Sequence, residues 1–175
     1  MAESFTNSLR KSVGSVVTNS SATIGISTTI ITGVTTTGIS VGDLIQNAYF
    51  VGGTRVSTVG SGQVTVDSIS TNTGIVTSQI VRTLGITTAY TAPEKSILIG
   101  GTLANNTTGQ VGAFVQVSSG STSYNLLYNV PVPAGSSVVI SDAGKTMLNA
   151  GDEIRVASDV ANSLDVTLSI LRGVS

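Results

Sequence analysis

The stretch Leu164-Asp-Val-Thr-Leu-Ser-Ile170 alternates strictly between apolar and polar side chains. Because successive side chains of a β-strand point to opposite faces, this pattern predicts a strand with one buried face and one wet face. The same alternation occurs in residues 111–117, 124–130 and 153–156. Residues 97–99, Ile-Leu-Ile, do not alternate and therefore predict a strand that is covered on both faces.

Turn-forming residues separate these strands at short intervals. Asn, Gly, Ser, Pro and Asp cluster in residues 105–109, 118–120, 133–135 and 150–152. Short strands spaced by roughly 8–12 residues are typical of a β-sandwich, of which the jelly roll is a common eight-stranded form. We therefore predict an all-β chain in which residues 85–175 form a jelly-roll-like β-sandwich.

Two further regions are predicted before the sandwich. Residues 22–84 read as a small β-module, with strands at 22–31, 55–59 and 63–69 and a hairpin around Gly60-Ser61-Gly62. This region has few large side chains, so we expect a thin core whose burial a neighbouring subunit completes. Residues 1–21 are polar and rich in Ser, which predicts an N-terminal arm.

The composition excludes several classes of function. The 175 residues include no Cys and no His, which leaves no thiolate nucleophile, Ser-His-Asp triad, zinc or haem site, or disulfide. A net charge of −1 argues against a basic groove for nucleic acid. The sequence has no run of 18 apolar residues, so it predicts no membrane-spanning segment. Because Glu3 lies in an N-terminal stretch without an apolar run, we also expect no secretory signal.

The acidic residues raise three alternatives, namely a metal site, a glycosidase and a sugar-binding protein. Asp142, Asp152, Glu153 and Asp159 offer the oxygen ligands that calcium prefers, but their spacing matches no EF-hand, and Asp152 is expected to cap a turn. A glycosidase needs only paired carboxylates, yet the chain has no Trp to hold a sugar. We therefore predict no enzyme activity, no catalytic residue, no metal and no cofactor, whereas glycan binding stays open.

Three segments together resemble a module of tailed-phage virion proteins, of the kind expected in marine cyanophages. They are Pro131-Val-Pro-Ala-Gly-Ser-Ser-Val-Val-Ile140, Lys145-Thr-Met-Leu-Asn-Ala-Gly-Asp-Glu-Ile-Arg-Val156 and Ser163-Leu-Asp-Val-Thr-Leu-Ser-Ile-Leu171. With the opening at Tyr90, the resemblance covers residues 86–172. Separately, residues 41–66 look like a short β-module of phage and bacterial surface proteins. Neither family brings catalytic residues.

The resemblance implies a non-enzymatic virion structural protein, first of all a capsid decoration or cement protein. A tail, neck or fibre component and a carbohydrate-binding adhesin for host attachment are the alternatives. The implied partners are the major capsid protein or other virion proteins, and we expect a homo-oligomer, with a trimer favoured. The expected location is the virion, assembled in the host cytoplasm.

The predicted arm supplies the candidate contacts with the particle. Its apolar residues are too few to fold alone, because ordering each residue costs roughly 1–2 kcal/mol of backbone entropy. An extended arm can instead add to the exposed sheet edge of a partner. We expect the arm and residues 22–84 to bind the particle while the sandwich projects outward, and we expect a chain starting at Leu84 still to fold. The candidate contact residues are Phe5, Leu9, Arg10, Lys11 and Val13.

Overall fold

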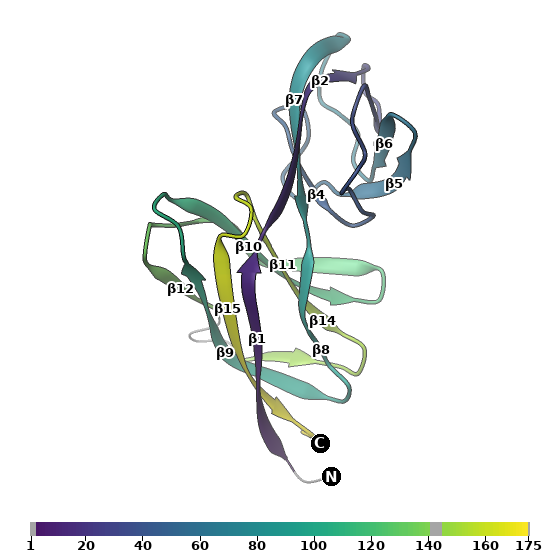
Figure 1. Ribbon diagram of the computed structural model, residues 1–175. Helices are drawn as coiled ribbons and strands as arrows, with labels where there is room; N and C mark the ends of the chain where they lie inside the picture. The colour runs from purple at the N-terminus through teal and green to yellow at the C-terminus, as the bar shows by residue number, and fades with distance from the viewer. Residues whose placement is uncertain (1–2, 141–144, 175) are drawn as a thin grey trace. The chain divides into compact units, whose positions relative to one another are not determined.

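The computed structural model describes residues 3–140 and 145–174, and none of these residues lies in a helix. The predicted all-β class is therefore confirmed. The chain divides into two units (Figure 1). Each unit has its own cluster of buried apolar side chains. Unit 1 combines Met1–Ser15 with Thr87–Ser175, and unit 2 is the continuous segment Val16–Ile86.

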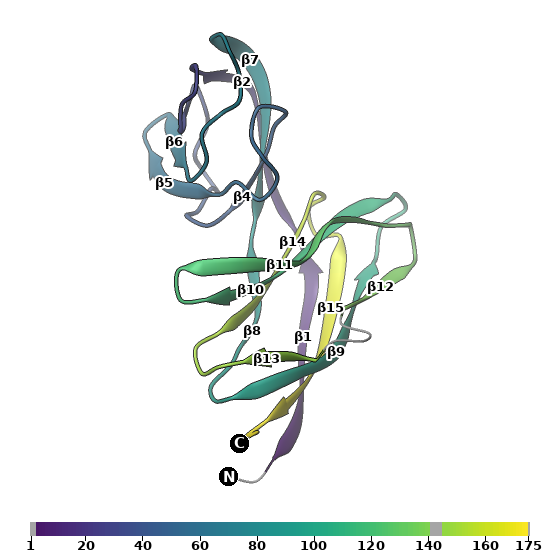
Figure 2. The same ribbon diagram turned by 180° about the vertical axis from the view of Figure 1, so that it is seen from behind.

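Unit 1 is a β-sandwich of two antiparallel sheets. The first sheet has the order β1-β15-β9-β12, with β13 also paired to β9, and the second has the order β11-β10-β14-β8. The strands are β1 (Ser4–Val13), β8 (Thr87–Thr91), β9 (Ser96–Asn105), β10 (Val111–Ser119), β11 (Thr122–Val132), β12 (Ser137–Ile140), β13 (Thr146–Leu148), β14 (Glu153–Ser158) and β15 (Leu164–Arg172). Figure 2 shows β12 and β13 beside successive parts of β9.

The strand pairs of unit 1 are those of a jelly roll. If β12 and β13 count as one interrupted strand, the first strand pairs with the eighth (β1 with β15) and the second with the seventh (β8 with β14). The third then pairs with the sixth (β9 with β12) and the fourth with the fifth (β10 with β11). This is one long antiparallel ribbon rolled into two sheets, which confirms the predicted sandwich.

The core of unit 1 lies between the two sheets and confirms the inward faces that the alternation predicts. The other face of β10 is not wet as predicted, because Gly112, Phe114 and Gln116 are buried as well. Leu164, Val166, Leu168 and Ile170 of β15 face the inward side chains of β10 across the sandwich. Because every second residue points inward, strands of seven to eleven residues supply three or four core side chains each. The inward residues of β10 are Val111, Ala113, Val115 and Val117.

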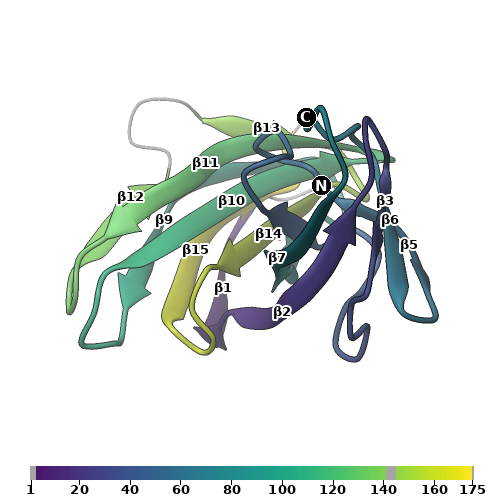
Figure 3. The same cartoon turned by 90° about the horizontal axis from the view of Figure 1, so that it is seen from above.

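The predicted N-terminal arm differs from the structure. Residues 4–13 form β1, which pairs with β15 over eight residue pairs and lies beside it in Figures 1 and 3. Two side chains of β1 also close the sandwich towards β8. Ser8 Oγ donates to the Ala89 carbonyl at 2.6 Å, and Arg10 Nε donates to the Thr88 carbonyl at 3.2 Å. The polar segment is therefore the first strand of the jelly roll, and unit 2 is inserted between its first and second strands.

Unit 2 is a six-stranded antiparallel sheet in the order β4-β7-β2-β3-β6-β5. The two edge regions meet, because Leu44 bridges Arg55 and the N–H groups of Ile45 and Val56 donate to the carbonyls of Thr54 and Asp43. The sheet thus closes into a small barrel, an arrangement that removes exposed edges. The strands are β2 (Ser15–Ile24), β3 (Ile30–Thr32), β4 (Leu44–Gln46), β5 (Val56–Gly60), β6 (Gln63–Val66) and β7 (Val76–Gly85).

The core of unit 2 is small, as predicted, and several large apolar side chains of the unit, among them Val41, Ile75 and Ile80, are exposed. Its buried side chains come mainly from Val and Ile, with Phe50 as the aromatic member, and include Ile24, Ile31 and Val81. The predicted hairpin is confirmed, since Val59 pairs with Val64 on either side of residues 60–63. The single strand expected over 22–31 is instead two strands, joined by a turn that begins at Gly25.

One carboxyl group of unit 2 is perturbed by its surroundings. Asp43 is buried, and its two carboxyl oxygens accept hydrogen bonds from the backbone N–H groups of Ser40 at 2.8 Å and Ile86 at 3.2 Å. Burial raises the pKa of this carboxyl above its ordinary value of 3.8, and the two hydrogen bonds offset only part of that rise. Asp43 ties the end of β7 to the turn before β4, which is a structural role.

Candidate interaction surface

The outward face of the sheet β1-β15-β9-β12 carries an exposed set of apolar side chains. Strand register aligns Phe5 with Leu171, Leu171 with Ile97, and Ile97 with Met147, so one apolar row crosses four strands. Phe5 is 79% exposed and Met147 is 55% exposed. Partners in an antiparallel pair point to the same face, which places this row on the side away from the core.

A second row crosses the same face about four residues along β1. It runs from Leu9 through Thr167 and Thr102 to Val139, and both of its apolar ends are more than half exposed. Ile99 adds a further exposed side chain between the rows. A groove of about 300 Å³ lies along the β1 side of this row, and it is lined by Leu9, Arg10, Lys11, Asp165, Val166 and Thr167.

Charged groups lie at the ends of this face. Lys11 is at one end, where Asp165 accepts hydrogen bonds from the Ser12 N–H at 2.8 Å and from Asn106 Nδ2 at 3.3 Å. At the other end Arg172 forms an ion pair with Glu94 at 3.0 Å. The middle of the face consists of apolar, Gly, Ser and Thr residues and Asn7, which pairs with Ser169. We call Phe5, Leu9, Ile97, Ile99, Val139, Met147 and Leu171 together the apolar face.

The structure separates the five contact residues predicted from the sequence. Phe5 and Leu9 lie on the apolar face, and Lys11 lies at its end. Arg10 points the other way, towards the Thr88 carbonyl of β8. Val13 is only 3% exposed and belongs to the core, so its side chain is not available to a partner.

The other members of the apolar face were missed in the sequence. Residues 97–99 were expected to be covered on both faces, but only Leu98 is buried, whereas Ile97 is half-buried and Ile99 is exposed. The apolar run without alternation is nevertheless the sequence signal for the apolar face. It indicates a strand with apolar side chains on its outer face as well, and such a face can pack against another surface. Val139 and Met147 follow from register alone, which the sequence does not reveal.

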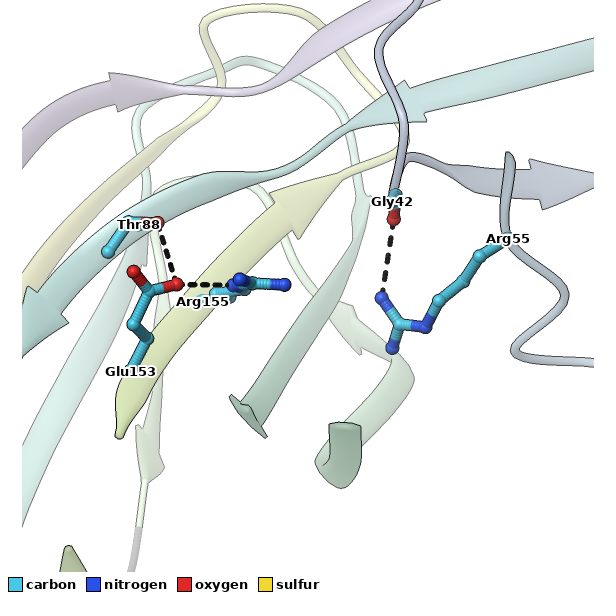
Figure 4. A network of polar contacts seen from close by, with 5 residues as sticks. All are labelled: Gly42, Arg55, Thr88, Glu153 and Arg155. Carbon is cyan, nitrogen blue, oxygen red and sulfur yellow. Dashed lines mark hydrogen bonds and ion pairs between the residues drawn. The ribbon is translucent and has the colours of Figure 1, made fainter. Parts of the chain in front are cut away.

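The acidic residues considered as calcium ligands are engaged separately. Asp152 Oδ2 accepts a hydrogen bond from the Asn149 N–H at 2.8 Å, which confirms its turn-capping role. Glu153 binds Arg155 at 2.6 Å and Thr88 at 3.4 Å (Figure 4). Asp142 lies outside the described residues. In the part of the chain that the structure describes, no three acidic side chains gather as ligands for a metal ion.

The same close-up shows a polar contact that belongs to unit 2 alone. Arg55 Nη1 donates to the Gly42 carbonyl at 3.3 Å (Figure 4). This contact adds to the bridge that closes the barrel.

Over residues 3–140 and 145–174, no helix has the length and apolar character needed to cross a membrane.

Comparison with known proteins gives distant similarities in structure. No protein-family model and no curated protein matches the chain. Two crystal structures of a pentameric capsid protein isolated from metagenomic phage sequences match 48% of the chain with 23% identity and a TM-score of 0.29. The matches cover 53% and 54% of those chains, so this chain spans about half the length of the capsid protein.

A third solved structure covers more of the chain at lower identity. The globular domain of zebrafish complement 1qA protein matches 75% of this chain and 94% of its own, with 11% identity and a TM-score of 0.29. At these identities and TM-scores, none of the three similarities bears on function.

Proposed function

We propose that the chain is a non-enzymatic structural protein of a tailed-phage virion, and more specifically a capsid decoration or cement protein. The observation that carries the proposal is the apolar face, with its seven apolar side chains and its charges confined to the ends. Burying such a face avoids the cost of desolvating charges. The resemblance of residues 86–172 to tailed-phage virion modules supports the choice of a virion as the setting.

The size of the face fits a stable contact with a capsid protein. The footprint of the face is roughly 570 Å². Its width is four strand positions spaced by about 4.8 Å, and its length is nine residues of β15 that rise about 3.3 Å each. A standard interface buries about 800 Å² on each partner. The accessible area of the face is larger than its flat footprint, because the side chains project from the sheet. The occupant that we propose is an uncharged patch on the major capsid protein, contacted by Phe5, Leu9 and their neighbours.

This assignment reverses the orientation on the particle that the sequence led us to expect. Phe5 and Leu9 belong to the sandwich and not to a separate arm, so we propose that the sandwich anchors the protein to the particle. The protein is then located in the assembled virion, and its contribution is mechanical. A tail, neck or fibre position stays an alternative, which the number of copies in each particle would distinguish from the capsid.

The first test is the double variant Phe5→Asp/Leu9→Asp. Charge on the apolar face should weaken binding to particles that lack the protein by at least roughly tenfold, equivalent to about 1.4 kcal/mol. Co-sedimentation measures the binding. The control is Ile75→Asp, which places the same charge at a residue of unit 2 that is 68% exposed. Equal binding by the double variant and the control would contradict the assignment of this face.

The assembly state that we propose is a homotrimer. β11 and β12 lie at outer positions of the two sandwich sheets, and such edges leave backbone groups available for pairing between copies. Light scattering of the purified protein at micromolar concentration should give three times the chain mass of 17.6 kDa. A stable monomer would contradict this prediction. A trimer that dissociates in Phe5→Asp/Leu9→Asp while particle binding persists would assign the apolar face to contacts between copies.

A further inference from the structure

Two loops at one end of unit 2 carry exposed isoleucine side chains. The loops are residues 25–29, between β2 and β3, and residues 67–75, between β6 and β7. Ile26 is 55% exposed, Ile69 is 61% exposed and Ile75 is 68% exposed. In Figure 1, β2 ends and β7 begins at this end of the unit. We call the three residues the isoleucine tip.

Hydrogen bonds hold the two loops against each other. Asn72 Nδ2 donates to the carbonyls of Gly25 at 2.7 Å and Gly74 at 2.6 Å. Ser70 Oγ donates to the same Gly25 carbonyl at 3.3 Å. The three isoleucines are the chain neighbours of Gly25, Gly74 and Ser70. They therefore start from neighbouring points of the backbone and form one apolar patch, which is a mark of a protein or membrane contact.

The backbone of the loops is hydrogen-bonded within the unit. The Thr28 N–H donates to Ser70 Oγ at 3.1 Å, and the Thr28 carbonyl accepts from the Ser70 N–H at 2.9 Å. The Thr71 N–H donates to the Tyr49 carbonyl at 2.8 Å. A backbone group without such a bond loses its water when it enters an apolar medium, at a high cost in free energy. These bonded groups avoid that cost.

Charge is nearly absent from this part of the molecule. Residues 16–86 contain four charged side chains, and only that of Asp67 belongs to either loop. Its Oδ1 accepts hydrogen bonds from the Arg55 N–H at 2.9 Å and from Ser68 Oγ at 3.2 Å. The two loops have no cationic side chain, so they offer no attraction to phosphates or to anionic lipids.

The isoleucine tip is too small for a stable contact with another protein. At about 100 Å² of apolar surface for each isoleucine side chain, the three together offer roughly 200 Å². A standard protein interface buries about 800 Å² on each partner. A lipid bilayer needs neither this area nor a matching shape, because its fluid chains adapt to each side chain and binding scales with the apolar area buried.

We propose that the isoleucine tip binds the surface of a lipid bilayer of low surface charge. The three side chains enter the boundary between the headgroups and the acyl chains, while the loop backbone stays level with the headgroups. One such contact is weak and reversible. Many copies on one particle strengthen the attachment through multivalency, and this last step alone rests on the proposed function.

The test is flotation of the full-length protein with vesicles of phosphatidylcholine. The protein should float with the vesicles, and the bound fraction should rise with the lipid concentration. The variant Ile69→Ser/Ile75→Ser should bind at least about tenfold more weakly, because it loses most of the apolar surface of the tip. Since both side chains are exposed, this variant should keep the Tm of the unaltered protein.

The matched control is Val41→Ser/Ile80→Ser, which removes two comparably exposed side chains of unit 2 outside the tip. It should bind vesicles as the unaltered protein does. Absence of flotation of the unaltered protein, or equal flotation of the two double variants, would overturn the proposal. Stronger binding to vesicles that contain phosphatidylglycerol, reversed by salt, would overturn it in favour of cationic side chains elsewhere.

Two further measurements separate this surface from the apolar face. Ile69→Ser/Ile75→Ser should co-sediment with particles as the unaltered protein does, and Phe5→Asp/Leu9→Asp should still float with vesicles. Loss of flotation in Phe5→Asp/Leu9→Asp would overturn the proposal in favour of lipid contact through the apolar face. An oligomer that forms without lipid and dissociates in Ile69→Ser/Ile75→Ser would overturn it in favour of a contact between copies.

Discussion

A chain that lacks residues 1–15 should fail to form the sandwich. β1 pairs with β15 over eight residue pairs, at roughly one hydrogen bond for each pair, and Val13 contributes a buried side chain. At about 1 kcal/mol net for each hydrogen bond, the loss is about 8 kcal/mol, comparable with the whole stability of a typical domain at 5–15 kcal/mol. Thermal unfolding followed by circular dichroism should show no cooperative transition for unit 1. This expectation replaces the idea that a chain starting at Leu84 folds.

The matched control removes the insertion and keeps the first strand. In this control a short Gly-rich linker replaces residues 16–86 and joins Ser15 to Thr87. The nine sandwich strands all remain. The linker can be short, because Ser8 and Arg10 bind carbonyls of β8 and so hold the two strands side by side. This shortened chain should unfold cooperatively. A cooperative transition in the chain without residues 1–15, at the same temperature as the control, would contradict the role given to β1.

The second large effect is expected for Asn105→Ala. The Asn105 side chain is almost fully buried and ends β9 with five hydrogen bonds. Its Nδ2 donates to the carbonyls of Gly109, Val132 and Pro133 at 2.7, 2.9 and 3.1 Å. Its Oδ1 accepts from the N–H and the hydroxyl of Thr107, each at 2.8 Å. One amide thus connects the end of β9 to the turn before β10 and to the end of β11.

Removing this amide breaks one buried and four part-buried hydrogen bonds, and a buried group left without a partner costs roughly 1–3 kcal/mol. We expect a loss of about 3 kcal/mol and a fall in Tm of roughly 10–20 °C. Calorimetry measures the change. The neighbouring variant Asn106→Ala is the control, because that side chain is exposed and makes one bond of 3.3 Å to Asp165. A similar fall in Tm for the two variants would contradict the large contribution to stability that we assign to the Asn105 hydrogen bonds.

The sandwich could be predicted from the sequence because apolar side chains recur at every second residue in its central strands. β10 and β15 each bury every second side chain between two sheets, and turn residues mark their ends. Long-range pairing was not accessible. β1 is an edge strand whose side facing β8 carries Thr6, Ser8 and Arg10, so it lacks the buried apolar face that alternation detects. Its partner β15 lies at the far end of the sequence, where no local pattern identifies it.

Bulges explain another difference from the sequence prediction. Tyr124, Leu126 and Tyr128 alternate with polar residues, and the pattern predicts that they share a core or interface face with Val130. All three are exposed in the structure. The first β10–β11 register shift, after Ala113, brings Leu127 to the core side in place of Leu126 and Tyr128. The second shift restores the alternation, so Tyr124 pairs with the inward-facing Val117 and is nevertheless 61% exposed.

The insertion of unit 2 after the first strand also determines when each part of the chain can fold. Residues 16–86 are contiguous and emerge early during synthesis, so the barrel can form while translation continues. β1 emerges even earlier but must wait for its partner β15, which lies about 150 residues later in the chain. Closing such a long loop is slow, and the sheet that carries the apolar face exists only after the last strand has been made. A chain that ends before β15 therefore lacks the apolar face.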